Sequence, residues 1–198
     1  MIKYIIFDLG EVYLKGLLGT EHFLEKEMNI PKAKILCMLK CRDLNALFLG
    51  KISEYEYFKR VIERNKLKIN ISKFEQCTRR NFNEIKGVKE IIIKLRKNYK
   101  LGLLSTHAKE WISYCNKKFN FYNLFDQKVF SYNIKVAKPN RRAYLHIIKK
   151  FKTKPQFCLF IDDQEKNLKA ARVLCMKTIL FKNAKQLKYD LRQLNLRI

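Results

Sequence analysis

The chain of 198 residues lacks any apolar run near the roughly 18–20 residues that a membrane-spanning helix needs. Its first residues contain neither a charged leader nor a small-residue cleavage site, so we expect no secretory signal. Six cysteines stand singly, without a CxxC pair or a Cys/His set at metal-ligand spacing. We therefore expect reduced, mostly buried thiols in a soluble, cytoplasmic globular protein without a membrane partner.

Acidic residues are scarce as well. The sequence has 18 acidic and 43 basic residues, which gives a formal net charge of +25. Such a charge indicates a nucleic-acid or other polyanionic partner. However, the chain has no RGG tract, helix-turn-helix pattern, aromatic RNA-binding motif or zinc-finger spacing. Heavy use of Lys, Asn and Ile, as an AT-rich genome dictates, explains the same charge. Nucleic acid therefore stays open as a partner without support from a motif, and a basic surface also favours small anions.

The first apolar run covers residues 4–7 and stops at an acidic residue, Asp8. A continuous run of β-branched and aromatic residues is typical of a central strand in a parallel sheet covered on both faces. A carboxylate at the end of such a strand is poorly solvated. It requires a partner, a metal or a chemical role.

Residues 17–87 contain no convincing strand and indicate a series of helices. We predict helices over 20–30, 31–50, 52–65 and 71–85, with a break at Gly50. Their start signals are Thr20 as an N-cap, Pro31 near a helix start, and the capping boxes Ser53/Glu56 and Ser72/Glu75.

From residue 88 onward the pattern alternates between the two element types. Helices are predicted over 88–99, 109–121, 141–151 and 165–174, and strands over 100–105, 127–132, 157–162 and 177–181. This alternation predicts an α/β fold, a Rossmann-like doubly wound parallel sheet with an inserted small helical domain.

Polar residues stand where the predicted strands end, namely Asp8, Ser105 and the pair Asp162-Asp163, with Lys138 in the loop after another strand. Parallel sheets bind ligands outside the carboxyl ends of their strands. Four separate segments are therefore expected to bring polar groups to one edge of the sheet.

The ordered segments IIFDLGEV, LGLLSTH, VFSYNIKVAKP and CLFIDDQEKN resemble the four motifs of the haloacid dehalogenase-like hydrolases. The nearest resemblance is to small phosphatases of that family whose first motif reads FDLGxV, and it covers nearly the whole chain. Four motifs in order are far more specific than any one of them. The resemblance implies an α/β core of residues 1–14 and 88–198. Residues 15–87 then form a helical C1 cap that closes over the site and selects the substrate.

The resemblance implies that Asp8 is the nucleophile, since a carboxylate can attack phosphorus and form an aspartyl-phosphate that water cleaves. It also implies Mg²⁺ held by Asp8, the backbone carbonyl of Gly10, Asp162 and Asp163. Adjacent like charges are costly without a cation, and Mg²⁺ suits carboxylate ligands. The alternatives are that Asp8 caps the following turn and that Asp163 caps the helix at 165. A cap explains only one of the two adjacent acids.

Ser105 is expected to donate a hydrogen bond to the phosphoryl oxygens, and Lys138 to neutralise charge on them and on Asp8. The resemblance adds Thr106 to the substrate-binding residues. It also implies that Asn167 orients the acids of the fourth motif.

The first motif departs from the usual DxD, because Gly10 stands where the second Asp protonates the leaving oxygen and activates water. Loss of one acid/base group typically costs about 10²–10⁴ in rate. Glu11 and His107 are the nearby candidates for that proton. Three other positions differ from the family pattern: Thr106 replaces Asn, and Lys135 and Cys175 replace Gly, the last at a left-handed helix end.

These patterns predict a Mg²⁺-dependent phosphatase acting on a small phosphorylated metabolite, either a sugar phosphate or a nucleotide, through an aspartyl-phosphate. A slow or non-catalytic domain that binds an anionic ligand or nucleic acid is the alternative, kept open by Gly10, Thr106 and the net charge. A 2-haloacid dehalogenase is a third reading. Asp162 and Asp163 argue against it, because Mg²⁺-independent dehalogenases of the family lack paired acids there.

Overall fold

A five-stranded, fully parallel sheet forms the centre of the computed structural model, which describes residues 1–198. The strand order is β3-β2-β1-β4-β5, so the first strand of the chain is the central one. The strands are β1 (Tyr4–Phe7), β2 (Lys100–Ser105), β3 (Gln127–Phe130), β4 (Cys158–Asp162) and β5 (Lys177–Leu180). The predicted α/β class with a doubly wound parallel sheet is confirmed.

Helices cover both faces of this sheet, because side chains alternate between the faces along each strand. Ile5 and Phe7 of β1 belong to a large apolar cluster on one face, whereas Ile6 belongs to a smaller cluster on the other. The first face is covered by α6 (Val88–Leu95), α7 (Lys109–Phe119) and α11 (Ala184–Gln193). The second face is covered by α9 (Arg141–Lys150) and α10 (Glu165–Val173).

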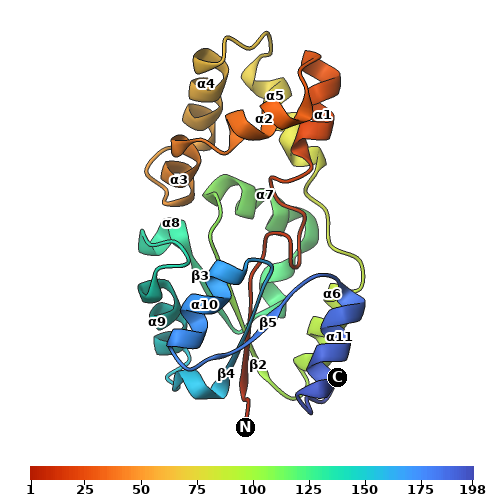
Figure 1. Cartoon of the computed structure of the whole chain (residues 1–198), viewed down its shortest axis with the longest axis vertical. Coiled ribbons are helices and arrows are strands. Elements are labelled where there is room, and N and C mark those ends of the chain that lie inside the picture. The colour runs from red at the N-terminus through yellow and green to blue at the C-terminus, as the bar shows by residue number, and fades with distance from the viewer.

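Five helices form a separate layer beyond the carboxyl ends of the strands, at the top of the view in Figure 1. We call this layer, residues 20–80, the five-helix cluster. It contains α1 (Thr20–Met28), α2 (Lys32–Leu39), α3 (Arg42–Phe48), α4 (Glu54–Arg64) and α5 (Ile71–Arg80). Its buried apolar side chains join the same large cluster as Phe7, so the layer packs against the sheet unit. The predicted division into a core of residues 1–14 and 88–198 and a cap of 15–87 stays a prediction.

The predicted single helix over residues 31–50 is wrong, because the structure has two helices there. Residue Cys41 is extended (φ −87°, ψ 175°) and lies between α2 and α3. Asp43 in the first turn of α3 is buried and paired with Arg60 and Arg64 of α4. A carboxylate fits a helix N-terminus, so this ion-pair set favours a new helix start.

Two of the predicted helix starts are also wrong. Gly19, with a φ of 103°, precedes α1, and Thr20 is already inside the helix. Asn70 caps α5 through its side chain, in place of Ser72. The Ser53 cap is confirmed, because its Oγ accepts a hydrogen bond from the backbone N–H of Glu56 at 3.2 Å. Pro31 stands directly before α2, as predicted.

The carboxyl-terminal half follows the predicted alternation, with three additions. The strand predicted to reach residue 132 ends at Phe130, and a short helix α8 (Ser131–Ile134) follows it. The helix α11 was not predicted at all. Two short 3₁₀ helices, Phe121–Leu124 and Pro155–Phe157, also occur. No helix combines the length and the apolar character that crossing a membrane requires.

Cys175 adopts the left-handed conformation expected of a glycine position, with a φ of 63° just after α10. It is exposed, so its side chain contributes little packing. We predict that Cys175→Gly raises the free energy of unfolding by about 0.5–1 kcal/mol, because glycine has no steric penalty in this region. Urea denaturation measures the change.

The matched control is Cys37→Gly, at an exposed cysteine inside α2. Glycine destabilises a helix interior, so this variant is expected to lose stability. Equal effects at both positions would contradict the backbone explanation.

Candidate active site

Three carboxylates meet where β1 and β4 end. The two strands are neighbours in parallel register, with Phe7 opposite Ile161, so Asp8 lies beside Asp162. One carboxylate oxygen each from Asp8, Asp162 and Asp163 lie within 4.8 Å of one another. Asp162 is fully buried and Asp8 is 6% exposed. Such a cluster requires positive charge nearby.

The cation within this cluster is Lys138. Its Nζ lies 2.7 Å from Asp8 Oδ1 and 2.7 Å from Asp162 Oδ2, and its side chain is 2% exposed. Burial acts to lower the pKa of Lys138, but the charges of Asp8 and Asp162 outweigh it and raise that pKa. Lys138 therefore stays an ammonium group. The backbone N–H of Lys138 donates to Thr106 Oγ1 at 3.1 Å, which holds its loop against the end of β2.

Asp8 and Asp163 bind protons more tightly than ordinary aspartates do. Burial raises the pKa of Asp8; Lys138 opposes this effect, and the charges of Asp162 and Asp163 add to it. Burial and the charge of Asp162 raise the pKa of Asp163 to about 6. One lysine is thus insufficient to compensate three carboxylates, and a further cation would favour their ionised forms.

Asp162 is held rigidly by groups from α10 and its preceding loop. Its Oδ1 accepts the backbone N–H of Gln164 at 2.8 Å, and the side-chain amide of Asn167 lies 3.0 and 3.1 Å from its two oxygens. Asn167 thus positions one acid of the pair. Asp163 does not cap α10, because Gln164 takes the N-cap position and the helix has no side-chain cap there. The capping alternative for Asp163 is therefore wrong.

The hydroxyl of Ser105 is buried at the end of β2, the strand next to β1. Its Oγ has no hydrogen-bond partner, and neither has Oδ1 of Asp163. A buried polar atom without a partner is costly, so each is suited to contact a bound group. Gly10 is two residues beyond Asp8. A Cβ built there would meet no atom nearer than His107 Cδ2 at 3.7 Å.

A cavity of about 290 Å³ lies between this edge and the five-helix cluster. The sheet unit contributes Asp8, Thr106, Ala137, Lys138, Gln164, Lys166 and Asn167 to its lining; the five-helix cluster contributes Lys40, Cys41, Leu44, Asn45 and Phe48. None of the second group was predicted from the sequence as a site residue. The break between α2 and α3, which turns these side chains toward the sheet, had no signal in the sequence.

Neither candidate for the missing proton donor is suited to the task. His107 is 7% exposed, and burial lowers its pKa to about 4, so it is neutral at pH 7. Its ring packs against Phe48 and Trp111 at centroid distances of 5.8 and 5.4 Å. Glu11 accepts the backbone N–H of Gly16 at 2.8 Å and pairs with a lysine.

Polar contacts tie the five-helix cluster to the sheet unit above this cavity, and one of them joins Lys135 Nζ to the carbonyl of Gly50 at 3.0 Å. The buried carboxylate of Glu54 in α4 accepts a hydrogen bond from Trp111 Nε1 of α7 at 2.7 Å. The Ser131 hydroxyl donates to the carbonyl of Phe48 at 2.5 Å and accepts the backbone N–H of His107 at 3.2 Å. These contacts fix the wall of the cavity that contains Phe48.

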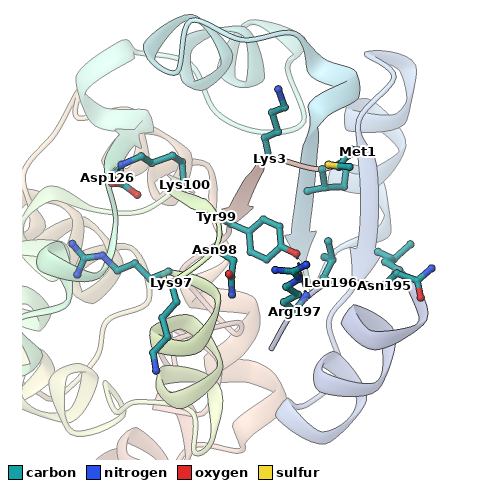
Figure 2. Close-up of a pocket in the computed structure, with 13 residues that line it drawn as sticks. Met1, Lys3, Lys97, Asn98, Tyr99, Lys100, Asp126, Asn195, Leu196 and Arg197 are labelled. Carbon is teal, nitrogen blue, oxygen red and sulfur yellow. Dashed lines mark hydrogen bonds and ion pairs between the residues drawn. The ribbon is translucent and has the colours of Figure 1, made fainter.

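A larger hollow of about 890 Å³ lies at the opposite, amino-terminal end of the sheet. Figure 2 shows its basic side chains, including Lys3, Lys97 and Arg197, around Tyr99. Much of its lining follows α6 and α11 directly, where cations complement the carbonyl ends of helices. It has one carboxylate, Asp126, which pairs with Lys100 at 3.3 Å. The acid cluster that could perform chemistry lies at the other end.

Solved structures share this architecture. A haloacid dehalogenase (HAD) family enzyme from Bacteroides thetaiotaomicron, in complex with magnesium and inorganic phosphate, matches with a TM-score of 0.78 and 21% identity over 92% of this chain and 96% of that one. A predicted HAD-like hydrolase from Porphyromonas gingivalis matches with a TM-score of 0.79 and 25% identity over all of both chains. The L-2-haloacid dehalogenase from Xanthobacter autotrophicus matches with a TM-score of 0.71 and 14% identity, over 97% of this chain and 83% of that one.

No curated protein matches the sequence. The family model described as haloacid dehalogenase-like hydrolase matches residues 21–181, which is most of the chain and includes the second, third and fourth motifs. The solved structures at lower identity agree with it in fold. The chain therefore belongs to the haloacid dehalogenase-like hydrolase family.

Proposed function

We propose that this protein is a Mg²⁺-dependent phosphatase that hydrolyses a small phosphate monoester, with Asp8 as the nucleophile. The observation that carries the proposal is the buried cluster of three carboxylates around Lys138, beside the unpartnered hydroxyl of Ser105. The magnesium and phosphate complex of the Bacteroides thetaiotaomicron enzyme supports this chemistry by analogy of fold. The five-helix cluster acts as the cap in this proposal.

The donor set fits Mg²⁺, which is a hard cation that prefers carboxylate and phosphate oxygens. We propose that Asp8, the backbone carbonyl of Gly10, Asp162 and Asp163 hold it. The unpartnered Oδ1 of Asp163 and its raised pKa both indicate a carboxylate in need of a cation. When bound, the ion neutralises charge on the phosphoryl group and on the attacking carboxylate.

The two oxygens of Asp8 have different surroundings, and this difference selects the attacking atom. Oδ1 accepts the backbone N–H of Leu9 at 2.7 Å and pairs with Lys138, whereas Oδ2 has neither contact. We propose that Oδ2 attacks phosphorus while the bond from phosphorus to the alcohol oxygen breaks. That oxygen leaves with the electron pair and takes a proton from solvent. Water then attacks the phosphorus of the aspartyl-phosphate, which releases inorganic phosphate and restores Asp8.

Two neighbours stabilise the charge that develops in these steps. Lys138 neutralises Asp8 and the adjacent phosphoryl oxygens, and Ser105 donates its hydroxyl hydrogen to one of them. Thr106 lines the cavity and holds the backbone of Lys138. Dehalogenation of a 2-haloacid is less well supported, because it gives no role to the acid pair Asp162-Asp163.

The central prediction concerns Asp8. We expect the wild-type protein to hydrolyse 4-nitrophenyl phosphate only when Mg²⁺ is present, and Asp8→Asn to lower kcat by at least about 10⁴-fold, because the nucleophile is lost. Release of nitrophenolate measures the rate. Asp190→Asn, on α11 and outside the site, is the matched control and should keep the wild-type rate. Hydrolysis that persists in Asp8→Asn would refute the assignment.

A second prediction follows from the raised pKa of Asp163. Since its folded-state pKa is about 6 against an ordinary 3.8, the folded protein binds this proton more tightly than the unfolded chain. The resulting stability is complete below pH 3.8 and is lost as pH rises through about 6. In a chelator, the free energy of unfolding should therefore fall by about 1 kcal/mol over this interval, after allowance for screening.

Urea denaturation between pH 4 and 7 tests this expectation. Asp163→Asn should make the pH dependence shallower, and the raised pKa of Asp8 accounts for the part that remains. At pH 7, Mg²⁺ at a hundred times its dissociation constant should stabilise the wild-type protein by about 2.7 kcal/mol. Asp190→Asn should behave as the wild type does. Equal pH profiles for wild type and Asp163→Asn would contradict the raised pKa, and the absence of stabilisation would contradict the metal site.

A third prediction uses the space beside Gly10, where a Cβ meets no close atom. Gly10→Asp introduces the missing acid. An alkoxide needs a proton in order to leave, whereas nitrophenolate does not. We expect the rate with an alkyl phosphate to rise by about 10²-fold relative to the rate with 4-nitrophenyl phosphate. Addition of Asp8→Asn should abolish both rates. An unchanged ratio would mean that another group already supplies the proton.

A further inference from the structure

The cavity over Asp8 contains more positive charge than the reacting phosphate requires. Three lysines line it, Lys40, Lys138 and Lys166, against the single carboxylate of Asp8. Lys138 is fully engaged with Asp8 and Asp162. Lys40 and Lys166 have no carboxylate within 4.0 Å, although 12 ion pairs occur elsewhere in the chain. Two cations therefore face the cavity without a protein partner.

These two lysines approach the cavity from different parts of the molecule. Lys40 follows α2, at the break before α3 in the five-helix cluster. Lys166 stands in the first turn of α10, four residues after Asp162 and next to Asn167. An anion that contacts both would therefore bridge the five-helix cluster and the sheet unit.

The position of Lys166 is unfavourable for the helix itself. A cation in the first turn opposes the helix dipole at a cost of about 0.3–1 kcal/mol. Glu165 in the same turn forms its ion pair with Arg172 at 2.5 Å and none with Lys166. Helix stability thus gives no reason for a lysine at this position, whereas an anion in the cavity does.

The remaining lining favours a small polar molecule over a nucleotide. A volume of about 290 Å³ is at the lower limit of ligand pockets. Phe48 is the only aromatic residue in the lining, and its ring already packs against His107 and Trp111. A nucleobase would therefore find no free ring on which to stack.

We propose that Lys40 and Lys166 form a second anion site within the catalytic cavity, and that the substrate is a small phosphate monoester with a second anionic group. This inference rests on the proposed phosphatase function. The second group is a carboxylate or another phosphate, a few bonds from the phosphoryl group that Asp8 attacks. Asn45 and Gln164 add uncharged hydrogen-bonding groups to the same lining.

The test compares substrates that differ only in the second charge. 3-Phosphoglycerate and glycerol 3-phosphate have the same skeleton, with a carboxylate in one and a hydroxymethyl group in the other. We expect kcat/KM to be at least about tenfold higher for 3-phosphoglycerate, since a charged hydrogen bond discriminates by that amount or more. Propane-1,3-diol bisphosphate against 3-hydroxypropyl phosphate is the corresponding pair for a second phosphate.

Lys40→Met and Lys166→Met keep most of the aliphatic stem and remove the charge. Each should lower kcat/KM for the preferred substrate, the one with two anionic groups, by about tenfold, mainly through KM. Each should also reduce the ratio of kcat/KM between the paired substrates. Lys169→Met, at an exposed position of the same helix α10, is the matched control and should keep the wild-type ratio. Equal losses with both members of a pair would overturn the proposal.

Binding measurements separate this proposal from the proposed function. Calorimetry with the members of both substrate pairs, in the presence of Mg²⁺, reports the second anion site even if no phosphate is hydrolysed. Tighter binding of 3-phosphoglycerate or of the bisphosphate that Lys40→Met and Lys166→Met weaken supports the site. If 4-nitrophenyl phosphate is hydrolysed but neither lysine variant changes the preference for a second anionic group, the second anion site is refuted and the phosphatase function stands.

Discussion

The buried ammonium of Lys138 between Asp8 and Asp162 is the interaction on which the rest of the site depends. It joins the ends of two adjacent strands to a loop that follows a third. Removal of one partner of a buried ion pair leaves an uncompensated charge and typically costs about 3–5 kcal/mol. The lysine therefore stabilises the carboxyl ends of β1 and β4 and, in the proposed reaction, the attacking carboxylate. The remaining excess of negative charge is what makes the edge suitable for a divalent cation.

The loop that contains Lys138 also connects the acid cluster to the wall of the cavity. Thr106 holds the backbone of Lys138, while Ser131 links the backbone of His107 to the carbonyl of Phe48. A movement of the five-helix cluster would therefore displace the third motif through the hydrogen bond between Ser131 and the carbonyl of Phe48. This arrangement places the cavity residues of the five-helix cluster next to the acid cluster, although the two sets are far apart in the chain.

The strands and the acids at their ends were predictable because their signals are local. A continuous apolar run such as residues 4–7 has few alternatives to a buried central strand, and Asp8 marks its end. The left-handed conformation of Cys175 was predictable from the family pattern, which has a glycine at this position. In contrast, the break between α2 and α3 depends on the pairing of Asp43 with Arg60 and Arg64, which lie on the next helix, α4.

The sequence by itself determined the parallel sheet, the order of the four motifs and the family, because apolar periodicity and strand-end residues are set by neighbours in the chain. Only the tertiary structure decided which side chains of the five-helix cluster line the cavity and that His107 is buried and neutral. It also decided that Lys40 and Lys166 line the same cavity as Asp8. Burial and charge compensation depend on contacts between distant segments, and such contacts have no signature in a local stretch of sequence.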